Sequence, residues 1–488
     1  MTYLGLYAQQ HRGQESAGIV SLHQGQHLSH KGSGLVGDVF SESHLDHLKG
    51  SAAIGHVRYS TTGLNEQTNI QPLMAQLFNG PVALAHNGNI VNSHVLRAQL
   101  KEQGAIFQGT NDTECLLHLL AKHPSNDIIR CLRETVPQLK GAFSLLLLTH
   151  DRLVAIRDPL GFRPLVLGTR PLEGGGVSYV VASETCAFDL IGAKFVREIE
   201  PGEIFWLDKD GEHSEGIAFD SSLTESSSSS VSEPIPASVS PPAVAESVTA
   251  SSAASSLRVS GSPRTKTAKC VFEHVYFARP DSNVFGLSVY ESRKAMGRQL
   301  AIESGVEADM VIPVPDSGVP AAIGYSAESG LPFELGIIRN HYIGRTFIQP
   351  SQSIRSFGVK IKLNPQSHVI RGKRVVVIDD SLVRGTTSQK IIRLIRQAGA
   401  KEVHFRIASP PTTGPCFYGV DTPKKSQLIA AQQSTEDIRR FIDADSLCYL
   451  SISGMLQAIG ASQDEYCAAC FDGRYPTELF GLDQEDSI

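Results

Sequence analysis

Two adjacent carboxylates followed by a hydroxyl-rich loop form the stretch of this sequence best suited to chemistry. Four apolar residues, 375–378, lead into the carboxylates, and the loop follows at 384–388. Hydroxyls and free backbone N–H groups at the start of a helix bind phosphate, whereas carboxylates suit ribose hydroxyls or Mg²⁺. The stretch therefore predicts a ribose 5-phosphate site. Its residues are Asp379, Asp380, Arg384, Gly385, Thr386, Thr387 and Ser388.

The residues around this loop predict a strand before it and a helix after it. Residues 375–378 are β-forming, and apolar residues recur at helical spacing over 391–398, before Gly399. Further strands are predicted at 310–315 and 403–408. This alternation indicates a parallel α/β sheet, in which ligands bind at the carboxyl ends of the strands. Without that setting, the Asp-Asp pair would equally suit a solvated acidic turn.

A second loop has the same surroundings. At 313–320, Pro-Val-Pro-Asp-Ser-Gly-Val-Pro follows a predicted strand and precedes a helix, and alone it would be an ordinary proline-stiffened turn. Together the two loops resemble the phosphoribosyl pyrophosphate (PRPP) signature and the pyrophosphate loop of type I phosphoribosyltransferases. The resemblance implies that Asp316, Ser317 and Gly318 also bind PRPP. It implies that Ser317 and the two carboxylates hold Mg²⁺, which prefers a few protein oxygens together with substrate phosphates.

A basic segment, 344–362, lies between these loops and is marked by glycine and proline. It would suit a solvated surface loop. We favour a lid that includes Arg345 and Lys360, because the C1 centre of PRPP becomes oxocarbenium-like as pyrophosphate leaves and water would attack it.

The composition gives no sign of a nucleic-acid or membrane partner. The 488 residues are 41% hydrophobic and 19% charged, with a net charge of −6. No apolar run approaches the roughly 20 residues of a membrane helix, and no signal peptide is apparent. Eight cysteines are too few for a disulfide scaffold, so we expect a reducing cytoplasm.

A serine-rich stretch divides the chain. Residues 221–267 consist mainly of Ser, Ala, Pro and Val without aromatic residues. Such a composition cannot bury enough surface to order itself, which predicts a flexible linker. The linker separates an N-terminal part, 1–220, from a C-terminal part, 268–488. Short apolar strands, glycine turns and two helical segments predict a β-rich α+β fold for the N-terminal part.

Five polar clusters interrupt the apolar strands of the N-terminal part. Each alone would suit a turn or a helix start, and Asp112 would be a good N-cap. In their order they resemble the glutaminase domain of class II (N-terminal nucleophile) amidotransferases. The resemblance implies that Arg58 and Asp112 bind the α-carboxylate and α-amino groups of glutamine, and that Asn87 and Gly88 form the oxyanion hole. The clusters are 11–18, 55–61, 85–89, 110–114 and 157–164.

The nucleophile implied by this resemblance is not found. The family uses an N-terminal cysteine on a strand that precedes a helix, whereas residues 1–7 here already resemble that helix. We expect a truncated or mis-started sequence, with a real loss of glutaminase activity as the alternative. Thr2 would lie on the helix, and Cys115 has apolar helix neighbours and no terminal amine. We therefore predict that this chain uses free ammonia but not glutamine as its nitrogen donor.

Four cysteines could form a metal centre. Cys467 and Cys470 form a C-x-x-C pair, and Cys270 and Cys416 could complete a set of four thiolates. Four thiolates can hold zinc or a 4Fe–4S cluster, and spacing alone does not decide between them. The flanking stretches resemble those of glutamine PRPP amidotransferases, a subset of which carries a 4Fe–4S cluster at these positions. The resemblance therefore implies iron and sulfide.

The resemblance to glutamine PRPP amidotransferases covers nearly the whole chain except the linker. It implies an α+β N-terminal nucleophile domain, then an α/β type I phosphoribosyltransferase domain with a parallel sheet. It also implies that ammonia from glutamine displaces pyrophosphate from PRPP in the first step of purine synthesis. Family members are commonly homotetramers inhibited by purine nucleotides. The alternatives are a transferase that uses only free ammonia, and a PRPP-sensing regulator, for which we see no helix-turn-helix.

Overall fold

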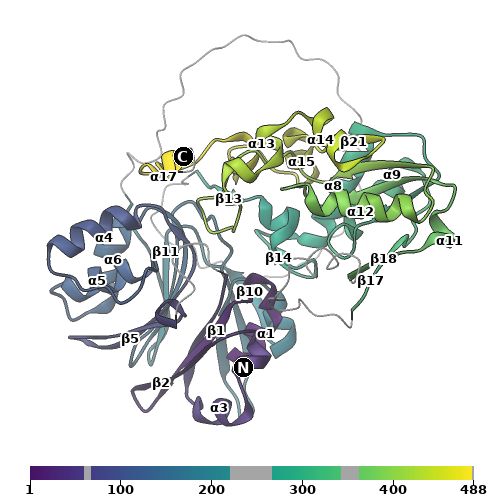
Figure 1. Cartoon of the computed structure of the whole chain (residues 1–488). Helices are drawn as coiled ribbons and strands as arrows, with labels where there is room; N and C mark the ends of the chain where they lie inside the picture. Colours follow the sequence, from purple (N-terminus) through teal and green to yellow (C-terminus); the bar gives the residue numbers. More distant parts are fainter. Residues whose placement is uncertain (60–66, 220–265, 342–361, 486–488) are drawn as a thin grey trace, which may run out of the picture.

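The computed structural model describes residues 1–59, 67–219, 266–341 and 362–485, so most of the predicted linker lies outside the described residues. Figure 1 shows the N-terminal part as a β-rich body beside a smaller α/β body. The yellow C-terminal end returns to the N-terminal part. There His94 Nε2 lies 3.0 Å from the carbonyl oxygen of Phe480, and Leu479 packs in one cluster with Val91.

The N-terminal part is built from three antiparallel sheets. The largest has the order β12 (Gly211–Gly216), β11 (Glu203–Asp208), β7 (Leu153–Arg157), β6 (Gly141–Leu148), β5 (Gly80–Ile90) and β4 (Leu73–Leu77). The second contains β2 (Gln26–Ser33), β1 (Ser16–His23) and β3 (Ala52–Arg58). The third contains β10 (Lys194–Glu198), β8 (Val166–Pro171) and β9 (Val177–Ala182).

Helices cover both outer faces of these stacked sheets. They are α1 (Thr2–Ala8), α2 (Val36–Val39), α3 (Glu42–His47), α4 (Ser93–Glu102), α5 (Glu114–Lys122), α6 (Ile128–Thr135) and α7 (Cys186–Ile191). Strand β5 shows why the layers form. Val82 and Leu84 face the core under α4–α6, whereas Ala83 and Ala85 face β1 and β3. The period-2 alternation places large side chains against helices and small ones between sheets.

The C-terminal part contains the predicted parallel sheet. Its order is β16 (Met310–Pro313), β19 (Arg374–Asp379), β20 (Glu402–Ile407) and β21 (Ser446–Tyr449). Along β19, Val376 and Ile378 pack into the core shared with α8 (Val289–Ser304) and α9 (Val319–Ser329). Val375 and Val377 pack into the opposite core, with α12 (Thr386–Gln397) and α14 (Thr435–Ile442). Burial on both faces explains the unbroken apolar run.

Shorter elements complete the C-terminal part. They are β13 (Lys269–Cys270), a π-helix (Glu273–Phe277), β14 (Asn283–Val284), β15 (Leu287–Ser288), β17 (Ile337–Arg339), β18 (Leu363–Pro365), α11 (Ser367–Ile370), α13 (Ile429–Gln432), α15 (Ile452–Ala458), β22 (Tyr466–Cys467), α16 (Ala469–Asp472) and α17 (Leu482–Glu485).

Buried charges join the two parts. Arg12 pairs with Glu184 of its own part and with Glu273 of the C-terminal part, where Nη2 lies 2.8 Å from Oε1. Ser282 donates to Glu184 over 2.7 Å. Removing one partner of such a buried pair costs about 3–5 kcal/mol, so this contact fixes how the parts are placed.

Candidate active site

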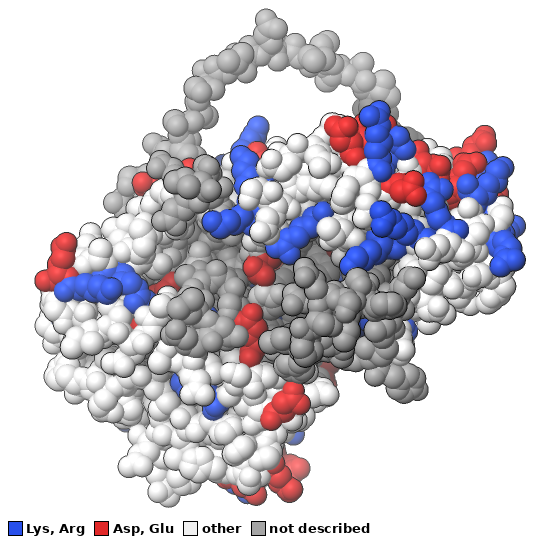
Figure 2. Space-filling model, viewed as in Figure 1, with Lys and Arg blue, Asp and Glu red and all other residues white. Residues whose placement is uncertain are grey.

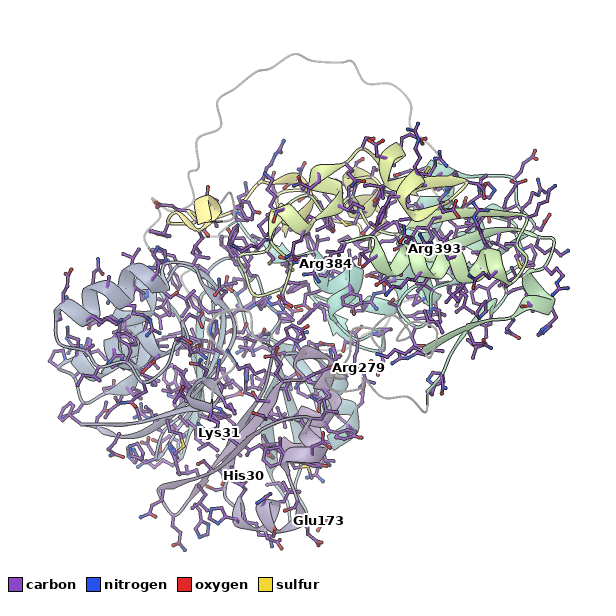
Figure 3. The ribbon with its side chains drawn as sticks, viewed as in Figure 1. His30, Lys31, Glu173, Arg279, Arg384 and Arg393 are labelled. Carbon is purple, nitrogen blue, oxygen red and sulfur yellow. The ribbon has the colours of Figure 1, made fainter. Side chains whose placement is uncertain are left out.

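One cavity lies between the two parts and collects residues from both. Its volume is about 1050 Å³. Figure 3 shows Arg279 and Arg384, which both line it, between the N-terminal and C-terminal bodies. The predicted residues that line it are Arg58, Asn87, Gly88, Asp112, Asp316, Ser317, Asp379, Asp380, Arg384, Gly385, Thr386, Thr387 and Ser388.

The predicted phosphate loop lies where β19 ends and α12 begins. Gly385 is the N-cap of α12 with φ +73°, and a Cβ there would lie 3.0 Å from Ile429. Glycine is therefore required by both conformation and space. Thr386 and Thr387 are exposed, whereas Ser388 is buried. The first N–H groups of the twelve-residue helix thus face the cavity beside two hydroxyls, as an anion site requires.

The two carboxylates lie at the carboxyl end of the central strand. Asp379 and Asp380 are 9% and 7% exposed. The N–H of Asp380 donates to Asp379 Oδ1 over 3.0 Å, and Ser381 Oγ donates to Asp380 Oδ1 over 2.6 Å. Burial and the neighbouring Asp380 raise the pKa of Asp379 well above its usual range. Two adjacent buried carboxylates favour binding of a cation or of sugar hydroxyls.

The second predicted loop follows β16, the strand that is paired in parallel with β19, and so lies beside the first. Asp316 forms an ion pair with Arg339 of β17. Ser317 lines the cavity, but Gly318 does not; a Cβ on Gly318 would lie 2.4 Å from the carbonyl oxygen of Ile378. The requirement for glycine there comes from packing on β19. Both predicted lid residues, Arg345 and Lys360, lie outside the described residues.

Figure 2 shows Lys and Arg gathered over the C-terminal part on the viewed face, interleaved with Asp and Glu. The lower N-terminal part of this face is mostly uncharged. Basic side chains beside a polyanion site increase the local concentration of substrate.

The predicted glutamine ligands meet at the other end of the cavity. Arg58 ends β3, and Asp112 lies just before α5. The helix N-cap is Thr113, so reading Asp112 as an N-cap is wrong: Asp112 Oδ2 instead accepts the N–H of Ile90 over 2.8 Å. The buried Asn69 fixes this loop by accepting two backbone N–H groups, each over 3.0 Å.

The predicted oxyanion residues lie within β5. Gly88 has φ +145°, and a Cβ there would lie 2.1 Å from the carbonyl oxygen of Ala142. Asn87 Nδ2 donates to Ser183 Oγ over 3.4 Å. His56 Nε2 lies 3.0 Å from the carbonyl oxygen of His86. Burial lowers the pKa of His56 to about 4, so it is a neutral donor that fixes the strand just before Asn87.

No thiol faces this site among the described residues that line the cavity. Cys115 is fully buried, and burial raises its pKa to about 12. A thiol held protonated is a poor nucleophile, so Cys115 does not replace the family's cysteine. Thr2 begins α1, as expected from the sequence.

The four cysteines predicted to form a metal centre lie together near the contact between the two parts. They are Cys270, Cys416, Cys467 and Cys470. Cys270 and Cys467 are directly paired across the parallel strands β13 and β22. The carbonyl oxygen of Cys470 accepts the N–H groups of Thr413 and Gly414, which holds the segment before Cys416 beside it. Burial, and then the other three cysteines, raise the pKa of Cys470 well above its usual range. Cys270 and Cys467 therefore share one strand pair, and Cys470 lies beside the segment that leads to Cys416.

Several residues that line the cavity carry no motif that the sequence could reveal. Arg293 is buried on α8 and donates to the carbonyl oxygens of His274 and Ala278 over 2.9 and 2.8 Å. Asp421 bonds to Tyr59 of the other part. Both lie in segments whose patterns fit ordinary packing or loops, so only the fold identifies them.

Comparisons with known proteins agree with this division. A family model described as a glutamine amidotransferase domain matches residues 56–189, and one described as a phosphoribosyl transferase domain matches residues 298–408. The chain is 44% identical over 485 residues to the amidophosphoribosyltransferase of Bacillus subtilis, covering 98% of this chain and 92% of that protein. This chain belongs to the amidophosphoribosyltransferase family.

Other amidophosphoribosyltransferases agree with this placement. Amidophosphoribosyltransferase 1, chloroplastic, of Arabidopsis thaliana is 49% identical over 479 residues, covering 98% of this chain and 76% of that protein. The solved glutamine PRPP amidotransferase of B. subtilis, complexed with ADP and GMP, matches with a TM-score of 0.82 at 44% identity, covering 98% and 94% of the two chains. The predicted family and fold class are confirmed. The protein is an enzyme, a phosphoribosyltransferase with a glutamine amidotransferase domain.

The described residues include no helix long and apolar enough to cross a membrane.

Proposed function

We propose that this enzyme forms 5-phosphoribosylamine by letting ammonia displace pyrophosphate from C1 of PRPP, the first step of purine synthesis. The observation that carries the proposal is the single cavity that contains both predicted sites. Ammonia released at Arg58 and Asp112 would enter the same cavity that Asp379 and Asp380 line. Neutral ammonia is the reactive form, so a route away from bulk water preserves it.

The transferase residues have separate tasks in this proposal. The start of α12 and the hydroxyls of Thr386, Thr387 and Ser388 bind the 5-phosphate. Asp379 and Asp380 bind the ribose hydroxyls and, with Ser317, hold Mg²⁺. The chemistry that Mg²⁺ supplies when bound is neutralisation of charge on the departing pyrophosphate. The predicted lid with Arg345 and Lys360 would exclude water while C1 is electron-deficient.

The glutamine residues also have separate tasks. Arg58 pairs with the α-carboxylate of glutamine, and Asp112 accepts a hydrogen bond from the α-ammonium group. Asn87 and the N–H of Gly88 stabilise the oxyanion that forms when the amide is attacked. For Asn87, this requires its side chain to leave Ser183 and turn toward the substrate.

We expect the 488-residue chain to release pyrophosphate from PRPP with ammonium chloride at alkaline pH, but not with glutamine. The reason is that the described transferase residues are all present, while no thiol is among the described residues that line the glutamine end of the cavity. The measurement is pyrophosphate release with each nitrogen donor, Mg²⁺ and saturating PRPP. Asp380→Asn is the control, because it must abolish release with either donor. Release with glutamine would contradict the prediction, and no release with ammonia would overturn the proposed transferase site.

We also propose that Cys270, Cys416, Cys467 and Cys470 hold a 4Fe–4S cluster. The fit rests on four buried or half-buried thiols whose segments are brought together by strand pairing and backbone hydrogen bonds. Zinc would draw its thiolates to about 2.3 Å from one ion. In the part of the chain that the structure describes, no three His, Cys or carboxylate side chains are grouped to hold one ion. A 4Fe–4S cluster binds each cysteine through a different iron, so the four thiols need not meet at one ion. Such a cluster would link three chain segments.

Metal analysis tests this cofactor. We expect about four iron and four sulfide per chain in anaerobically purified protein, with brown colour, because each of four thiolates would ligate one iron. Cys467→Ser should lose iron, whereas Cys131→Ser should retain it, because Cys131 is buried within α6 and away from the centre. Stoichiometric zinc without sulfide would contradict the proposal.

Three further properties are proposed for this enzyme. Inhibition by purine nucleotides is suggested by the B. subtilis structure, which is complexed with ADP and GMP. A homotetramer is suggested by the family resemblance. A reducing cytoplasm is suggested by the eight cysteines, all of which are free thiols.

A further inference from the structure

A loop of the N-terminal part forms one wall of the cysteine centre. The loop connects β7 to β8 and includes residues 158–165. The N–H of Ala268 donates to the carbonyl oxygen of Leu160 over 2.7 Å, and the N–H of Cys270 donates to that of Phe162 over 3.0 Å. The Phe162 ring also stacks on Tyr418, with centroids 4.2 Å apart. The glutaminase part is therefore in direct backbone contact with a cysteine of the centre.

The next residue in this loop is an arginine whose donors are not satisfied. The side chain of Arg163 is 0% exposed. Its Nη2 lies 3.2 Å from Glu273 Oε1, but none of its three nitrogens donates a well-directed hydrogen bond to a described residue. Glu273 is already bound by Arg12 through two nitrogens, over 2.8 and 3.1 Å. A buried guanidinium with unused donors is costly, and such a group indicates a missing acceptor.

A ligand of the proposed cluster lies next to Arg163 along this loop, because the N–H of Cys270 donates to the carbonyl oxygen of Phe162, the residue before Arg163. The positive charge of Arg163 lowers the pKa values of Cys270 and Cys416, opposing burial, which raises them. Glu273 acts on Cys270 in the opposite direction and raises its pKa. A positive charge at Arg163 therefore acts on two of the four proposed ligands.

We propose that Arg163 is the counter-charge of the iron–sulfur cluster and donates hydrogen bonds to its sulfur atoms. This inference rests on the proposed cluster. A 4Fe–4S core bound by four thiolates would carry a net negative charge even when its iron ions are counted, and a buried charge needs a partner of opposite sign. Hydrogen bonds to sulfur and nearby charge set the reduction potential of such clusters. Because Arg163 belongs to the glutaminase part, the cluster is complete only when that part is docked on the transferase part.

Two substitutions of opposite electrostatic sign test this role in the full chain. Arg163→Gln should shift the cluster's reduction potential to more negative values and release iron about 10–100-fold faster, as loss of an outer-shell partner does. Glu273→Gln leaves more of the Arg163 charge for the sulfurs, so it should shift the potential to less negative values. The readouts are iron and sulfide content, an anaerobic redox titration followed by electron paramagnetic resonance, and iron release to a chelator.

Matched variants separate charge from packing. Arg163→Lys keeps the charge, so its potential should lie closer to that of the unchanged protein than the Arg163→Gln value. Arg157→Lys changes a second buried arginine, which donates to the carbonyl oxygens of Arg163 and Ile199 over 3.0 and 2.7 Å. The Arg157→Lys substitution should leave the reduction potential of the cluster unchanged.

The outcomes are distinguishable. If the unchanged protein contains no iron, the proposed cluster is wrong and this role for Arg163 is wrong with it. If the unchanged protein contains the cluster, potentials that move in the same direction in Arg163→Gln and Glu273→Gln overturn the role of Arg163 alone. Equal values in Arg163→Gln and Arg163→Lys also overturn it. If Arg163→Gln does not fold, the direction of the shift in Glu273→Gln still decides.

Discussion

Replacing Asp379 by Asn lowers PRPP-dependent pyrophosphate release with ammonia by at least about 100-fold. The effect is large because loss of one preorganised polar group in a buried reaction site typically costs about 10²–10³ in rate. Asp379 is 9% exposed at the end of the central strand, so water cannot replace its carboxylate. The measurement is kcat and KM for PRPP at saturating Mg²⁺ and ammonia.

Two controls separate this effect from misfolding. Glu307→Gln removes a carboxylate that is 94% exposed on the same part and should retain full activity. The thermal midpoint of Asp379→Asn should be no lower than that of the unchanged protein, because the substitution relieves repulsion between two adjacent buried carboxylates. Activity within threefold of the unchanged protein would show that this carboxylate has no role in the reaction.

Replacing Gly297 by Ala unfolds or strongly destabilises the transferase part, by about 3 kcal/mol or more. Gly297 lies on α8, where a Cβ would lie 1.9 Å from the carbonyl oxygen of Ala321 on α9. Gly324 of α9 is equally close to the carbonyl oxygen of Lys294. The two backbones touch, so neither helix has room for a methyl group. The measurement is the urea midpoint, followed by ammonia-dependent activity.

Gly5→Ala is the matched control, because nothing lies within 4 Å of a Cβ at that position in α1. There the same substitution should raise stability by up to about 1 kcal/mol, since Ala is the better helix former. A Gly297→Ala protein with an unchanged urea midpoint would show that α8 and α9 can separate without loss, and the close packing described above would be wrong.

The sequence by itself predicted the features that depend on contiguous residues. The run from Asp379 to Ser388 contains a strand end, two carboxylates and a helix start, so its chemistry can be read without the fold. The apolar run before it predicts a strand buried on both faces, which the two cores on either side of β19 confirm. The order of the polar clusters predicted the family, which the relatives confirm.

The tertiary structure decided what depends on residues far apart in the chain. That the glutamine end and the PRPP end share one cavity follows from the buried contact of Arg12 with Glu273, which are 261 positions apart. Gly318 lies in a loop that resembles a ligand-binding motif. Close packing against the carbonyl oxygen of Ile378 is the reason that this position requires glycine. Asp112 had the right position for a helix cap, yet one of its oxygens accepts the N–H of Ile90 and the other accepts the N–H of Thr113, which is itself the N-cap. A local pattern cannot show which distant group competes for a side chain.

Arg163 is the clearest case of the same limit. The polar cluster 157–164 contains two arginines, Arg157 and Arg163, and nothing in the local sequence shows that their roles differ. In the fold, Arg157 donates hydrogen bonds to backbone carbonyl oxygens. Arg163 is buried near the four cysteines, and its three side-chain nitrogens donate no hydrogen bond to a described residue. Residue type sets what a side chain can do, and the long-range packing around it decides which partner remains for it.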